Sequence, residues 1–61
     1  MSDTDELLLR TANLRARARE ILTKAETMRD AGARMKMREI AANYERLAER
    51  FEKAAGAPDK A

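Results

Sequence analysis

Large apolar side chains recur every seven residues in two runs of this 61-residue chain, with a short segment around Gly32 between the runs. The positions are Leu7, Leu14, Ile21 and Met28 in the first run, and Met37, Tyr44 and Phe51 in the second. Seven residues make almost two turns of an α-helix, so each run marks one face of a helix. A break of about two to four residues makes successive helices antiparallel neighbours. The spacing therefore predicts an all-α fold, an antiparallel two-helix hairpin.

The hairpin is expected to occupy the whole chain as a single domain, because 61 residues lie near the lower limit for independent folding. Its predicted parts are helix 1 over about residues 4–29, a turn over about 29–32, helix 2 over about 31–55 and a flexible tail over 56–61. This division places roughly 80% of the chain in helices.

Short polar residues and a glycine mark the outer ends of the two helices. Asp3 or Thr4 is expected to cap helix 1, and Asp3 has capping-box spacing to Glu6. Gly56 is expected just beyond the end of helix 2, where a left-handed residue commonly ends a helix, and Pro58 prevents its continuation.

The turn allows two descriptions. Gly32 can end helix 1 as a left-handed residue, or it can lie in the first turn of helix 2 behind an Asp30 cap. The second description is preferred, because the short link from Met28 to Met37 then leaves both apolar runs facing inward.

Each predicted helix carries a core stripe. In helix 1 it advances by steps of four and three residues with large and small side chains alternating, and in helix 2 it takes three positions of every seven. The stripes comprise Leu7, Thr11, Leu14, Ala18, Ile21, Ala25 and Met28 in helix 1, and Met37, Ile40, Ala41, Tyr44, Leu47, Ala48 and Phe51 in helix 2. The apolar surface is wider than one neighbouring helix covers, so a lone hairpin is expected to leave Leu8, Leu22, Ile40 or Leu47 partly in water.

A partner subunit is the expected source of additional core. Small domains commonly supplement their cores with disulfides, metals or oligomerisation, and this chain has neither Cys nor His. We therefore expect a homo-oligomer, most simply a dimer that forms a four-helix bundle.

Positive charge is concentrated in the middle of the chain. Residues 10–38 contain nine Lys and Arg against three Asp and Glu, a local net charge of +6, although the whole chain carries only +2. The candidate contacts to nucleic acid or to an acidic partner are Arg10, Arg17, Lys24, Arg29, Arg34, Lys36 and Arg38. A solvated helix face that uses Arg as a helix former is the simpler interpretation, and no aromatic side chains accompany the bases for stacking.

No residue pattern indicates catalysis. The chain lacks His, Cys and a glycine-rich phosphate loop, and a two-helix hairpin has little interior in which to perturb a carboxylate pair. We expect a non-enzyme with no catalytic, cofactor or metal site. The acidic N-terminus differs from a signal peptide, and no apolar run approaches the roughly 20 residues of a membrane span. The expected location is the cytoplasm.

The segments Ala25–Asp30 and Ile40–Arg50 resemble a set of short, uncharacterised alphaproteobacterial proteins with helices rich in Ala, Arg and Glu. The shared sequence motif is similar to IA-x-x-YE-x-LAER, and the resemblance covers about half of the chain. Those proteins commonly have Asp-Pro-Glu at the helix junction, where this chain has Asp30, Ala31 and Gly32. The resemblance implies a helical hairpin and a bacterial origin, and it implies no activity.

In length and hairpin layout the chain is also similar to the plasmid repressor-of-primer proteins, which are dimeric four-helix bundles that bind paired RNA loops. This similarity is one of architecture only. Two functions follow as expectations: a self-associating structural or interaction protein that presents charged faces to a protein partner, or an RNA- or DNA-binding regulator that uses the basic face of helix 1 and the turn.

Overall fold

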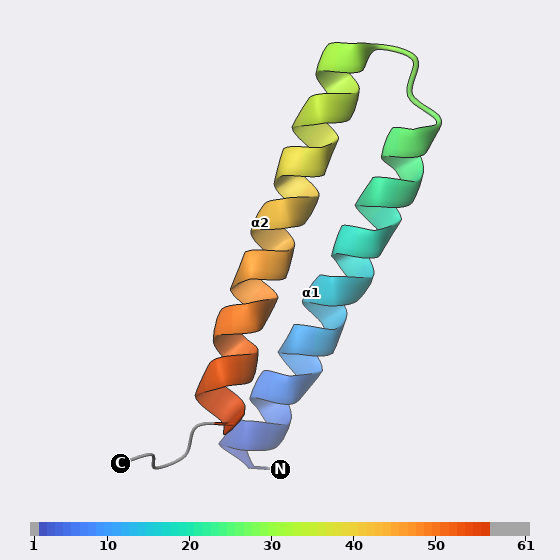
Figure 1. Cartoon of the computed structure of the whole chain (residues 1–61). Coiled ribbons are helices and arrows are strands. Elements are labelled where there is room, and N and C mark those ends of the chain that lie inside the picture. Colours follow the sequence, from blue (N-terminus) through green and yellow to red (C-terminus); the bar gives the residue numbers. More distant parts are fainter. Residues whose placement is uncertain (1, 57–61) are drawn as a thin grey trace.

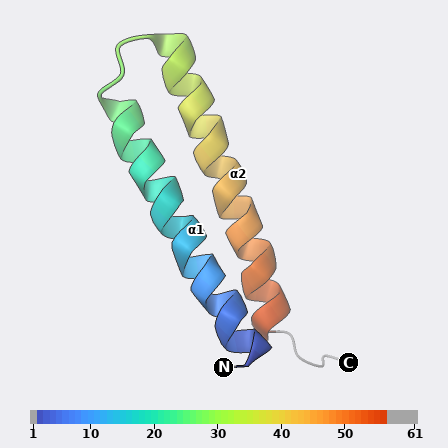
Figure 2. The same ribbon diagram turned by 180° about the vertical axis from the view of Figure 1, so that it is seen from behind.

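A computed structural model describes residues 2–56 of the chain as two long helices, α1 (Asp3–Glu26) and α2 (Ala31–Gly56). The helices lie side by side and antiparallel, so the start of α1 and the end of α2 lie at the same end of the hairpin (Figures 1 and 2). No strand occurs within residues 2–56. The all-α class and the two-helix hairpin predicted from the sequence are confirmed.

Helix α1 begins one residue earlier than predicted. Ser2 has an extended backbone, and its hydroxyl oxygen accepts a hydrogen bond from the Asp5 N–H at 3.1 Å. Asp3 and Thr4 are already helical, so the prediction that one of them caps the helix is wrong, as is the capping box from Asp3 to Glu6. The acidic residues instead occupy the first turn, where the helix dipole favours negative charge.

Helix α1 also ends earlier, at Glu26 rather than near residue 29. Its last carbonyls are satisfied locally: the Thr27 backbone N–H and the Thr27 hydroxyl both donate to the carbonyl of Lys24, at 3.1 and 2.9 Å. The chain then crosses to the second helix through Thr27–Asp30. Arg34 secures this link by donating from Nη1 to the Met28 carbonyl at 2.8 Å.

The predicted cap of the second helix is confirmed. The Ala33 N–H donates to Oδ2 of Asp30 at 3.2 Å, and Gly32 lies in the first turn of α2. The alternative left-handed role for Gly32 is excluded, because no residue in the described part of the chain has a positive φ. Gly56 is the last residue of α2 and not a residue beyond its end, so that prediction is wrong. The tail expected after it, including Pro58, lies outside the described residues.

Small side chains line the seam between the two helices. The fully buried residues, none more than 4% exposed, are Thr11, Ala18 and Ala25 of α1 and Ala41 and Ala48 of α2. Alanine places no atoms beyond Cβ between the backbones, so the helices approach closely along their length. The Thr11 hydroxyl also stays within the seam, 2.9 Å from the Leu7 carbonyl oxygen and 3.4 Å from that of Ala48.

Candidate interaction face

Seven large side chains of the predicted stripes lie beside the seam and are only partly buried. They are Leu7, Leu14, Ile21 and Met28 of α1, and Met37, Tyr44 and Phe51 of α2. Relative to a seam alanine, Leu14 precedes Ala18 by four residues just as Tyr44 precedes Ala48 by four. At about 100° per residue, both rows are therefore rotated from the seam in the same sense. In two antiparallel helices, equal rotations bring both rows to the same side of the hairpin.

Ile40 and Leu47 extend this surface outward along α2. Each is 39% exposed in the hairpin, although the sequence pattern places both in the stripe of helix 2. Together with the seven large side chains they form a continuous surface, called here the apolar face. This face is only partly covered in the single hairpin, and it contains every large hydrophobic residue of both predicted stripes.

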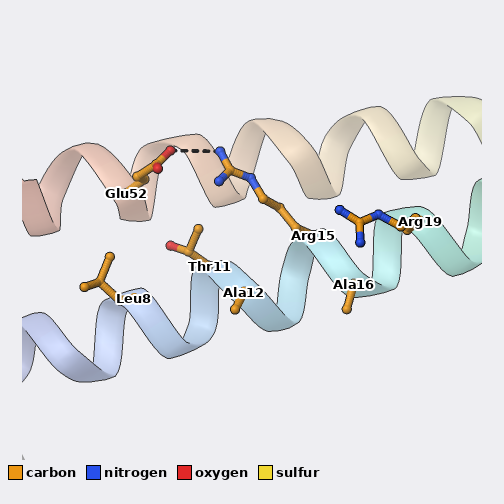
Figure 3. Close-up of a pocket in the computed structure, with 7 residues that line it drawn as sticks. All are labelled: Leu8, Thr11, Ala12, Arg15, Ala16, Arg19 and Glu52. Carbon is orange, nitrogen blue, oxygen red and sulfur yellow. Dashed lines mark hydrogen bonds and ion pairs between the residues drawn. The ribbon is translucent and has the colours of Figure 1, made fainter.

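The opposite side of the hairpin carries an open groove of about 420 Å³ along α1 (Figure 3). Its lining comprises Leu8, Thr11, Ala12, Arg15, Ala16, Arg19 and Glu52. The groove contains an ion pair between the helices, with Nη2 of Arg15 2.8 Å from Oε1 of Glu52. This hydrogen bond and the Glu52 charge raise the pKa of Arg15. Both side chains are about half exposed, so the pair fixes geometry more than it adds stability.

The sequence alone does not connect Arg15 with Glu52. Their pairing depends on the register between the helices, which the spacing along one helix does not specify. Leu8 and Leu22, 47% and 38% exposed, are on the groove side rather than on the apolar face. Leu8, Leu22, Ile40 and Leu47 are the four side chains that the width of the apolar stripes predicts to be partly exposed to water in a single hairpin.

Six of the seven Lys and Arg residues predicted as contacts form two exposed groups, and the seventh has a structural role. Arg10, Arg17 and Lys24 are exposed along the outer edge of α1 beside the apolar face, and Arg29, Lys36 and Arg38 are exposed near the turn. Arg34 is half-buried and holds the Met28 carbonyl, so it supports the link between the helices. Within residues 2–56 none of the other six forms an ion pair.

No three His, Cys, Asp or Glu side chains gather to hold a metal ion in the part of the chain that the structure describes. Neither α1 nor α2 has a stretch long and apolar enough to cross a membrane. Comparisons of the chain with protein-family models, curated proteins and solved structures find no match.

Proposed function

We propose that the protein is a small, non-catalytic interaction protein of the bacterial cytoplasm, which associates with a second copy of itself through the apolar face. The resulting four-helix bundle presents its charged outer surfaces to a protein partner. The observation that carries this proposal is the separation of the stripe residues by size: alanines and a threonine fill the seam, while the large hydrophobic residues of both stripes lie together on one side and are incompletely buried.

The energetics of burial support the proposal. Complete burial of a Leu, Ile, Phe or Met side chain contributes roughly 1.5–3 kcal/mol, whereas alanine offers much less area. The fully buried residues of the hairpin are only alanine and threonine, and its large side chains are incompletely buried, so the single hairpin realises only part of this stabilisation. A second copy of the apolar face supplies a complementary hydrophobic surface of the same extent, as two-fold interfaces do.

Charged substitutions on the apolar face test the proposal. We expect Ile40→Lys or Leu47→Lys to raise the dimer Kd at least roughly tenfold, because each dimer would bury two new charges in place of two aliphatic side chains. Sedimentation equilibrium over micromolar to millimolar protein measures the effect. Leu9→Lys and Met35→Lys are matched controls, since both residues are large, apolar and more than half exposed away from the face. A wild-type chain that stays monomeric and folded throughout this range would contradict the proposal.

A nucleic-acid-binding regulator is the second candidate function, and the exposed row of Arg10, Arg17 and Lys24 favours it. Successive residues of this row are seven positions apart, roughly 10.5 Å along the helix, a spacing that can follow a phosphate backbone.

Replacement of all three residues by Gln tests the nucleic-acid candidate. Gln is a comparable helix former, so helicity should persist. If the row binds phosphates, affinity for duplex or looped RNA falls and the slope of log K against log salt decreases by up to about 0.9 per lost contact. Fluorescence anisotropy at several salt concentrations measures both. If the wild-type protein does not bind RNA at physiological salt, or if the three substitutions leave its affinity unchanged, the row is an ordinary solvated surface. We expect that outcome.

A further inference from the structure

We infer that the second copy docks head to tail, with α1 antiparallel to the partner's α1 and α2 antiparallel to the partner's α2, so that the two turns lie at opposite ends of the bundle. This inference rests on the proposed self-association through the apolar face. It specifies which helices become neighbours and in which register.

The charge order along one edge of α1 carries the inference. Six exposed residues follow one another at steps of four and three on the outer side of the apolar face, and this set is called here the α1 edge: Glu6, Arg10, Asn13, Arg17, Glu20 and Lys24. At about 100° per residue these positions form one band along the helix. The band reads negative, positive, neutral, positive, negative, positive.

This order is complementary to its own reverse. When two copies of α1 lie antiparallel so that facing residue numbers add to about 30, Glu6 meets the partner's Lys24 and Glu20 meets the partner's Arg10. Asn13 then faces the partner's Arg17. A two-fold axis makes each contact occur twice, so all four carboxylates of the two edges face cations.

The same register gives the longest overlap of the helices. Helix α1 runs from Asp3 to Glu26, so its midpoint lies between Leu14 and Arg15. Antiparallel copies that overlap along their whole length therefore bring together residues whose numbers add to about 29. Charge pairing and helix overlap select the same alignment.

The other face-to-face arrangement, with both turns at one end, places α1 beside the partner's α2. The charged row of Arg10 and Arg17 would then border the partner's Ile40 and Leu47. It would also gather the exposed cations near both turns, including Lys24, at a single end, where like charges repel. Head-to-tail docking instead sets the apolar row of α2 against the same row of the partner.

A single spin label at the turn distinguishes the two arrangements. The chain has no native Cys, and Arg29 is exposed, so Arg29→Cys accepts one nitroxide per chain. Head-to-tail docking separates the two labels by about the length of α1, roughly 36 Å, in pulsed electron paramagnetic resonance. Docking with both turns at one end brings them within about 20 Å, since packed helices lie about 8–10 Å apart.

Mixed charge variants test the register itself. One variant carries Glu6→Lys and Glu20→Lys, and the other carries Arg10→Glu and Lys24→Glu. Each homodimer then opposes like charges along the α1 edges, whereas the heterodimer pairs opposite charges at all four positions. Native mass spectrometry of the mixture should show the heterodimer enriched at least roughly tenfold over a statistical mixture, given the usual strength of exposed ion pairs.

Control variants carry the same charge changes on the other surfaces of the hairpin. Glu45→Lys with Glu49→Lys, mixed with Arg46→Glu and Lys53→Glu, should give a nearly statistical mixture at physiological salt. A folded dimer with the short label distance, or equal enrichment in edge and control mixtures, overturns the inference while leaving self-association intact. A chain that remains monomeric overturns the proposed function and this inference with it.

Discussion

Replacing Phe51 with Ala is expected to cost about 3–5 kcal/mol per chain, as large-to-small changes of buried aromatic residues do. Phe51 is only half-buried in the single hairpin, and the partner would cover the rest of its ring. The loss is therefore expected in two places, as a lower midpoint of urea unfolding and as a weaker dimer. Circular dichroism at several protein concentrations, combined with sedimentation, separates the two contributions.

Leu9→Ala is the control for Phe51→Ala, because Leu9 is 54% exposed and lies away from the apolar face. Surface substitutions of this kind usually change stability by less than about 0.5 kcal/mol. Equal unfolding midpoints for the two variants would show that the ring of Phe51 is not buried in the native assembly.

Replacing Ala48 with Leu is expected to destabilise the hairpin by about 1–3 kcal/mol or more, through overpacking rather than through a cavity. Ala48 has no exposed area, and its carbonyl oxygen lies 3.4 Å from the Thr11 hydroxyl of the other helix. A leucine there forces the helices apart along the seam. A core of this size supplies only about 3–5 kcal/mol, so the loss is a large share of the total.

Urea unfolding of Ala48→Leu should be compared with that of Ala42→Leu, in which the same side chain is added at an exposed position of α2. Leucine is nearly as good a helix former as alanine, so the control should keep the wild-type midpoint. Identical midpoints for both variants would rule out a tightly packed seam.

The helices and their inward faces could be predicted because periodicity is a local property of the chain. Steps of three and four residues correctly placed Ala18 and Ala48 at the contact between the helices. The same steps could not divide the stripes into a small-residue seam and a large-residue face. That division depends on how closely the two backbones approach, which the alanines of both helices determine together.

The errors at the helix ends have a local cause. Ser2, Asp3 and Thr4 are all good N-cap residues, and no neighbouring residue favours Ser2 over the other two. At the other end of α1 no Gly or Pro marks the stop. The helix ends where the Thr27 hydroxyl donates a hydrogen bond to the Lys24 carbonyl. Arg34, from the following helix, donates to the Met28 carbonyl. The Arg34 contact forms only once the chain has reversed, so it could not be read from the sequence.

The short link Thr27–Asp30 also bears on how the chain reaches its folded state. Seam positions near the link, such as Ala25, close small loops when they meet the other helix, whereas Thr11 and Ala48 are separated by 37 residues. The entropy lost on closing a loop rises with its length, so the first contacts between the helices form beside the turn. Later contacts then extend an existing pair of helices towards the termini. We therefore expect contacts between the helices to form from the Asp30 cap outward. Substitutions at the turn should alter the folding rate more than substitutions near Ser2.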